Sequence, residues 1–125
     1  MTDSSGGEYN ATVWSYNASA DLAVLNVTSA DSKAWAWFVT DSDLEEVGER
    51  IYVYGNPLGV VGTFCEGLLS AVRNNGAILQ LSAPLDYGNS GSPVFNEYAQ
   101  VIGVVSYRKE DTTAEIFYAV SANAI

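Results

Sequence analysis

Histidine is absent from the 125-residue sequence, and cysteine occurs once, at Cys65. A zinc site would have to depend on carboxylates and one thiol, so we expect neither a metal nor any other cofactor. One cysteine also excludes an internal disulfide and a Cys-x-x-Cys redox or metal motif. Because the segment that leads to it, Val60–Phe64, is mostly apolar, we interpret Cys65 as a small core residue rather than a nucleophile.

Basic residues are scarce in this chain. Five lysines and arginines stand against 15 aspartates and glutamates, which gives a formal net charge of −10. Such a charge repels phosphate backbones and anionic lipid surfaces, so we expect no nucleic-acid partner. The densest acidic stretch, Asp41–Glu49, is interpreted as a solvated face rather than as an acidic binding tail.

Long apolar runs are also missing. No run approaches the ~20 residues of a membrane-spanning helix, so no membrane span is predicted. The polar opening, Met1–Gly7, lacks the basic and apolar regions of a signal peptide, and we expect it to be flexible. Asn10, Asn17 and Asn26 each begin an Asn-x-Ser/Thr sequon, which matters only in a eukaryotic secretory setting.

Apolar residues are nevertheless plentiful, at 48% of the chain, which is enough for a hydrophobic core. No internal repeat and no linker divides the sequence. Residues 1–125 are therefore predicted to form one domain or part of one.

Short segments rich in β-branched and aromatic residues follow one another, separated by Gly, Asn, Asp and Pro. This pattern is typical of an all-β protein, and regularly spaced antiparallel strands predict a barrel or a sandwich. The pair Asn75-Gly76 tolerates positive φ and predicts a hairpin turn. The expected strands are Glu8 to Tyr16, Leu22 to Val27, Trp35 to Val39, Arg50 to Tyr54, Gly62 to Val72, Ala77 to Ser82, Pro93 to Phe95, Gln100 to Tyr107 and Glu115 to Val120.

Helical signals are weak. Ser42–Glu45 fits a capping box, but Gly48 stops the helix that it would begin after barely two turns. Ser121 is a candidate cap for a second helix at the end of the chain.

The segment Gly88-Asn89-Ser90-Gly91-Ser92-Pro93 carries the most chemical information. On a turn between strands, Gly88 permits a backbone conformation that side chains forbid, so the amides of Gly88 and Ser90 can converge to stabilise an oxyanion. Gly91 leaves room beside Ser90 for a substrate carbonyl. However, Gly, Asn and Ser are also the commonest residues of an inert turn, so this pattern alone does not decide between the two.

Five other segments place this turn in context. Together with it, in the same order along the chain, they resemble trypsin-fold serine proteases of the bacterial HtrA-like (DegP-like) branch. The matching segments are Asp21-Leu22-Ala23-Val24-Leu25, Gly55-Asn56-Pro57-Leu58-Gly59, Gly67-Leu68-Leu69-Ser70-Ala71, Val101-Ile102-Gly103-Val104-Val105 and Phe117-Tyr118-Ala119-Val120. The resemblance runs from about Glu8 to the end of the chain.

The resemblance implies a chymotrypsin-like antiparallel β-barrel fold, with a complete second barrel and the last strands of the first. Ser90 is then the nucleophile, Asp21 is the carboxylate that orients the catalytic histidine, and the amides of Gly88 and Ser90 form the oxyanion hole. The family's histidine lies before the segment of Asp21, in a part that this chain does not contain. We therefore expect Met1 to mark a fragment boundary, a truncated gene prediction or a genuine loss. Without a histidine beside it, Asp21 is expected to be solvated or hydrogen-bonded to backbone amides.

Substrate-binding residues also follow from the resemblance, at Pro84, Leu85 and Tyr87 before the nucleophile and at Val105 and Ser106 on the strand that lines the cleft. Tyr87 replaces a proline that is usual in the HtrA-like branch. Pro84 stands where a trypsin has its basic-residue-selecting aspartate. We therefore hypothesise that the specificity pocket accepts small or aliphatic side chains.

Three tryptophans and eight tyrosines are interpreted as core or edge-strand packing rather than as a ligand platform. With part of the first barrel missing, some of these aromatic residues, such as Trp14, Trp35 or Trp37, would be exposed. A large apolar patch of this kind predicts a homo-oligomer formed through the exposed barrel edge.

Three functions remain open at this point. The first is a serine endopeptidase that acts on polypeptides through an acyl-enzyme, with this chain inactive by itself because it lacks a base. The second is a non-catalytic pseudo-protease that binds peptides or serves assembly. The third is an unrelated β-sandwich adhesion module with a chance Gly-Asn-Ser-Gly turn. The resemblance also implies a periplasmic or secreted location, and the lack of disulfides fits a bacterial branch better than the disulfide-rich animal trypsins.

Overall fold

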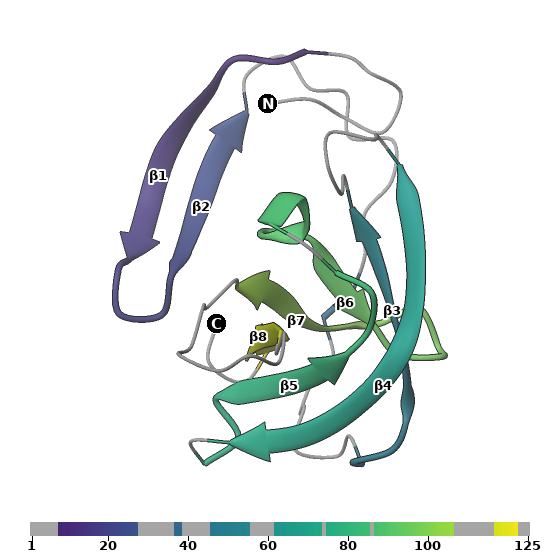
Figure 1. Cartoon of the computed structure of the whole chain (residues 1–125). Coiled ribbons are helices and arrows are strands. Elements are labelled where there is room, and N and C mark those ends of the chain that lie inside the picture. Colours follow the sequence, from purple (N-terminus) through teal and green to yellow (C-terminus); the bar gives the residue numbers. More distant parts are fainter. Residues whose placement is uncertain are drawn as a thin grey trace. The chain divides into compact units, whose positions relative to one another are not determined.

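The computed structural model describes residues 8–27, 37–38, 46–55, 62–73, 75–85, 87–106 and 117–122. These residues belong to two compact units, Met1–Trp35 and Ala36–Ile125, and each unit is described by itself. Within the described ranges the regular elements are eight β-strands and a short 3-10 helix, so the predicted all-β class is confirmed (Figure 1). None of the helical residues described forms a helix long and apolar enough to cross a membrane.

The first unit contains an antiparallel hairpin of β1 (Ala11–Asn17) and β2 (Leu22–Val27). Asn17 closes the turn between them, because its side-chain Oδ1 accepts the amide of Ala20 at 3.1 Å. Asp21 follows with a φ of 56°, a left-handed conformation that aspartate tolerates better than most residues. Asp21 therefore stands directly before β2, exposed to solvent as expected.

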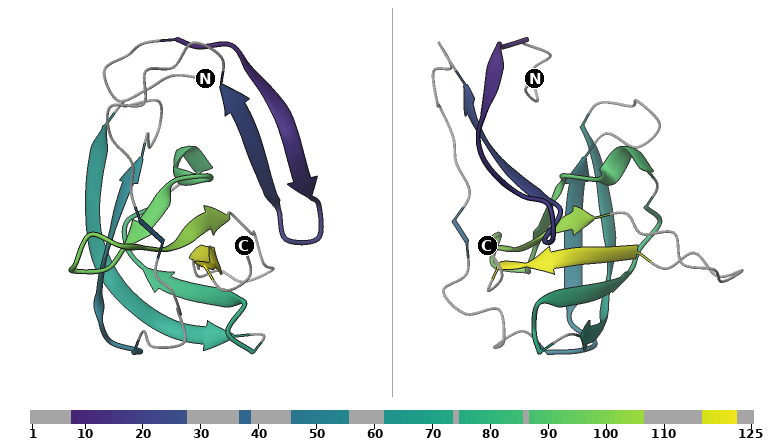
Figure 2. Two further views of the ribbon diagram at one scale, coloured as in Figure 1. Left: turned by 180° about the vertical axis from the view of Figure 1, so that it is seen from behind. Right: turned by 90° about the vertical axis from the view of Figure 1, so that its left-hand side faces the viewer.

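The second unit contains a closed antiparallel barrel with the strand order β3-β4-β5-β8-β7-β6. Its strands are β3 (Arg50–Gly55), β4 (Thr63–Arg73), β5 (Ile78–Ser82), β6 (Pro93–Phe95), β7 (Val101–Ser106) and β8 (Phe117–Ser121). The long β4 curves around the barrel between β3 and β5 (Figures 1 and 2). An irregularity between Leu69 and Ala71 helps it to bend. This closed barrel agrees with the complete second barrel of a chymotrypsin-like fold.

Alternation of side chains along the strands builds the core. On β3, Ile51 and Val53 are fully buried, whereas Arg50 and Tyr54 are exposed on the outer face. Cys65 belongs to the core cluster, and its thiol donates to the carbonyl of Pro84 at a sulfur–oxygen distance of 3.7 Å, so its predicted core role is confirmed. The other members of the cluster are Ile51, Val53, Leu69, Leu79, Leu81, Leu85, Val94, Ile102, Val105, Phe117 and Ala119.

Several strand limits agree with the sequence prediction. β2 and β6 begin and end at the predicted residues, and the other strands overlap their predicted ranges. In the β4–β5 hairpin, Asn75 and Gly76 both have positive φ, at 54° and 88°. This is the conformation that the Asn-Gly pair predicted.

The other predicted elements are described only in part or lie outside the described residues. Of the predicted strand Trp35 to Val39, residues 37 and 38 are described, and Phe38 forms an isolated parallel bridge with Val101. The capping box at Ser42–Glu45 and the flexible opening at residues 1–7 lie outside the described residues. Ser121 is the last residue of β8, and residues 123–125, where the second helix was expected, also lie outside.

Candidate active site

The turn that carries Ser90 connects the 3-10 helix η3 (Tyr87–Asn89) to the start of β6. Ser90 is exposed at the end of this short helix. Gly91 follows with a φ of 86°, and a Cβ added there would meet no atom within 4 Å. The space beside the Cα atom of Gly91 is therefore open, and the room that we expected there for a substrate carbonyl stays a prediction.

Gly88 does not have the positive φ that we expected of it. We expected Gly88 to take the backbone conformation that side chains forbid, but the positive φ of this turn belongs to Gly91. Gly88 lies inside η3, where the backbone is helical. The left-handed conformation that glycine permits is thus found at Gly91, after Ser90, because the chain must turn sharply there to enter β6.

Hydrogen bonds attach this turn to the neighbouring strand β7. The amide of Gly91 donates to the carbonyl of Val105 at 2.8 Å, and the amide of Val105 donates to the carbonyl of Ser92 at 2.9 Å. Within the turn, the amide of Ser92 donates to the carbonyl of Asn89, also at 2.9 Å. Ser90 is therefore held between two residues whose backbones are fixed, Asn89 on one side and Gly91 on the other.

Gly55, at the end of β3, packs against the same turn. A Cβ built on Gly55 would overlap Oγ of Ser92 and would lie 2.7 Å from Oδ1 of Asn89. Only a glycine leaves space for this approach. The two glycine-containing motifs of the sequence, which are more than 30 residues apart, thus meet at the base of the turn that carries Ser90.

The side chain of Asn89 has an environment that the sequence did not predict. Its side chain is fully buried, and neither Nδ2 nor Oδ1 has a hydrogen-bond partner in the described structure. A buried polar group without a partner costs about 1–3 kcal/mol, because it has lost its hydrogen bonds to water. The side chain of Asn89 therefore has no hydrogen-bond partner among the described residues to offset the cost of its burial. Asn89 and Gly55 both belong to motifs of the sequence, but these motifs predicted neither the burial of Asn89 nor the packing of Gly55 against the turn.

The residues predicted to contact substrate have different exposures. Pro84 is exposed, whereas Leu85 is buried in the barrel core. Val105 and Ser106 are buried on β7, and Tyr87 is the first residue of η3. The contact of these five residues with a substrate stays a prediction.

Asp21 and Ser90 belong to different units of the structure, the hairpin and the barrel. The catalytic pairing that the resemblance implies for them stays a prediction. The chain contains no imidazole that could join them.

Comparisons with known proteins agree with this architecture. The family model of the trypsin-like peptidase domain matches residues 1–104. The chain is also similar to proteins named "Serine protease HtrA-like" from Staphylococcus aureus strains USA300 and NCTC 8325, at 38% identity over 103 residues in both cases. Each match covers 70% of this chain and 13% of the relative, so the chain spans a small part of these longer proteins. Since the family match includes the hairpin, the turn of Ser90 and most of the barrel, the chain belongs to the family of trypsin-like peptidase domains.

Proposed function

We propose that this chain supplies the nucleophile and the oxyanion-binding turn of a serine endopeptidase. The observation that carries the proposal is the exposed Ser90, held on a turn that is hydrogen-bonded to β7 and followed by the open space at Gly91. A hydroxyl that stands free on a fixed backbone satisfies the first requirement of covalent catalysis, because the nucleophile must reach a carbonyl carbon without rearrangement.

In the proposed reaction, Oγ of Ser90 bonds to the carbonyl carbon of a peptide while an imidazole takes the hydroxyl proton. The carbonyl π electrons move to oxygen, and the backbone amides of Gly88 and Ser90 donate hydrogen bonds to this oxyanion. The tetrahedral intermediate then breaks its carbon–nitrogen bond, and the imidazolium returns the proton to the leaving amine. Water hydrolyses the remaining ester by the reverse set of transfers.

Asp21 is assigned the role of holding the imidazole in place. Its carboxylate would accept the Nδ1–H of the ring and stabilise the imidazolium that forms during attack. The position directly before β2 supports this role, because a turn residue with a fixed φ presents its side chain from a defined point. The imidazole itself must come from polypeptide that this sequence does not include.

The chain alone is accordingly proposed to be nearly inactive. Loss of the base from a serine protease triad lowers the turnover rate by roughly 10⁴–10⁶-fold. As a whole protein, the enzyme would act on polypeptides that present small or aliphatic side chains, because Pro84 offers no carboxylate to a basic one. A library cleaved mainly after lysine or arginine would contradict this specificity. The similarity to HtrA-like proteases also favours a periplasmic or secreted setting.

Labelling with a fluorophosphonate probe tests the assignment of Ser90. The probe should modify a longer chain, in which the first-barrel segment of one of the Staphylococcus relatives precedes residue 1. Ser90→Ala should abolish the modification, and Ser92→Ala, which removes a neighbouring hydroxyl, should retain it. Modification that survives Ser90→Ala would overturn the assignment.

A second function is favoured by the absence of histidine. The chain would then be a pseudo-protease that keeps the fold in order to bind peptides or to assemble. This function predicts saturable binding of unmodified peptides at the turn, with no labelling of Ser90 in the natural protein. Labelling of Ser90 in the natural protein, without a segment borrowed from a relative, would exclude it.

A further inference from the structure

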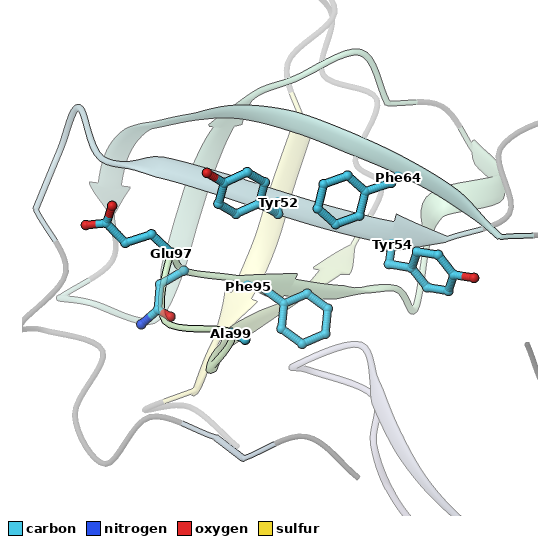
Figure 3. A pocket seen from close by; sticks show the side chains of 7 residues that line it. Tyr52, Tyr54, Phe64, Phe95, Glu97 and Ala99 are labelled. Carbon is cyan, nitrogen blue, oxygen red and sulfur yellow. The ribbon is translucent and has the colours of Figure 1, made fainter. Parts of the chain in front are cut away.

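A pocket lies on the outer face of the barrel, and none of the residues of the Ser90 turn lines it. It encloses about 440 Å³, a size typical of ligand pockets. Aromatic side chains from three strands form most of its wall, and the turn after β6 completes it (Figure 3). The lining residues are Tyr52, Tyr54, Phe64, Phe95, Asn96, Glu97 and Ala99.

Strand pairing fixes the aromatic wall. Tyr52 lies opposite Phe95 on β6, and Tyr54 lies opposite Phe64 on β4. The rings of Tyr52 and Phe64 are stacked, with centroids 5.5 Å apart and planes inclined by 22°. The pocket therefore has preformed ring faces, although Phe64 remains 62% exposed to solvent.

The other wall is a well-ordered turn. Oδ1 of Asn96 accepts the amides of Tyr98 and Gln100 at 2.9 and 3.0 Å, and its Nδ2 donates to the side chain of Gln100 at 3.0 Å. Ala99 has a φ of 60° in this turn. These bonds fix the backbone on both sides of Glu97, so the point from which its carboxylate can reach the pocket is defined.

The charges around the pocket favour a cation. Aromatic faces carry negative charge density, which attracts ammonium and guanidinium groups. Glu97 adds a carboxylate at the pocket wall (Figure 3). Arg50, the basic residue of β3, pairs with Glu66 at 3.4 Å, and the whole chain carries a net charge of −10. A positively charged group is therefore the complementary occupant.

We propose that this pocket binds an arginine side chain of a partner polypeptide. A planar guanidinium stacks on aromatic rings, forms paired hydrogen bonds with a carboxylate, and brings an apolar stem that suits the remaining ring surface. The pocket combines these three elements, in its stacked rings, Glu97 and the apolar wall. It is a recognition site apart from the proposed nucleophile.

The test uses the 125-residue protein and two capped peptides, acetyl-Gly-Arg-Gly-amide and the same peptide with neutral citrulline. Amide chemical shifts measured by NMR during titration report the site and the affinity. The arginine peptide should shift the amides of residues 52, 54, 64 and 95–99, and the citrulline peptide should bind at least about threefold more weakly. Equal binding of the two peptides, or shifts confined to other residues, would overturn the proposal.

Variants give a second, independent readout. Phe64→Ala and Glu97→Gln should each weaken arginine binding about two- to fivefold, as expected for one exposed cation–π contact or ion pair. Tyr98→Ala is the matched control, because Tyr98 belongs to the same turn and is 77% exposed but does not line the pocket. Equal affinities of all three variants would contradict the proposal, as would self-association of the protein that buries the same residues and excludes the peptide.

Discussion

Asn89 and Asn96 are both buried in this barrel, but we expect their replacement by leucine to change the free energy of unfolding in opposite directions. Asn89 has no hydrogen-bond partner for either side-chain atom in the described structure. Asn96, which is 5% exposed, uses both side-chain atoms in the turn after β6. Replacing each by leucine keeps the number and branching of the heavy atoms and removes the polar groups, so the pair separates hydrogen bonding from volume.

The expected free energies follow from these contacts. Asn89→Leu removes two unpaired polar atoms, each worth about 1–3 kcal/mol in a dry site, against a packing penalty of similar size for the wider leucine. We expect the free energy of unfolding to rise by about 1 kcal/mol. Asn96→Leu leaves the amides of Tyr98 and Gln100 without their acceptor, and should lower it by about 2–4 kcal/mol.

Urea denaturation of the parent and both variants measures these differences directly, and thermal unfolding gives a second estimate. A change of 1 kcal/mol corresponds to about 3–5 °C in a domain of this size. The reasoning is refuted if Asn89→Leu destabilises the protein as much as Asn96→Leu. That outcome would mean that burial of the Asn89 side chain carries no net cost to the folded protein.

Three further predictions concern the site and the hairpin. The Asn89→Asp variant should lose stability as the pH rises from about 4. Burial raises the pKa of the introduced carboxyl above its unfolded value of about 3.9, so the folded state binds more protons than the unfolded state. A free energy of unfolding that does not change with pH would contradict this. Gly55→Ala should lower the free energy of unfolding by about 1–3 kcal/mol, because the added Cβ overlaps Oγ of Ser92. Adding Ser92→Ala should restore part of this loss. An unchanged urea midpoint in Gly55→Ala would contradict the close approach of Gly55 to Ser92. The hairpin side chain Trp14 is 76% exposed, so the chain should self-associate in sedimentation experiments and Trp14→Ser should weaken this; a parent that stays monomeric at all concentrations would exclude it.

Much of the barrel could be predicted because its signals are local. The strand predicted from Arg50 to Tyr54 and the turn predicted at Asn75-Gly76 both depend on neighbouring residues, and both predictions agree with the structure. The closure of the barrel is not local. The pairing of β3 with β6 joins residues such as Tyr52 and Phe95, and nothing in either segment specifies the other as its partner.

The candidate site also combines features that depend on neighbouring residues with features that depend on distant ones. The motif around Ser90 predicted a turn, but its glycines and serines alone did not distinguish a nucleophile site from an inert turn. Ser90 became the candidate nucleophile through the resemblance of the other five segments to HtrA-like proteases. The motif did not reveal that Gly91 rather than Gly88 takes the positive φ, since either glycine could accept it. The buried, unpaired state of Asn89 depends on its contact with Gly55 from a distant strand, and so became visible only in the folded chain.

The central claim is that these residues carry the nucleophile of a peptidase but not its base. The most direct measurement is the rate of fluorophosphonate labelling at Ser90, compared between the 125-residue chain and the chain extended by a histidine-bearing first-barrel segment. We predict that the extended chain reacts at least about 10³-fold faster, because the base activates the hydroxyl. Fast labelling of Ser90 in the short chain, equal to that of the extended chain, would contradict the account.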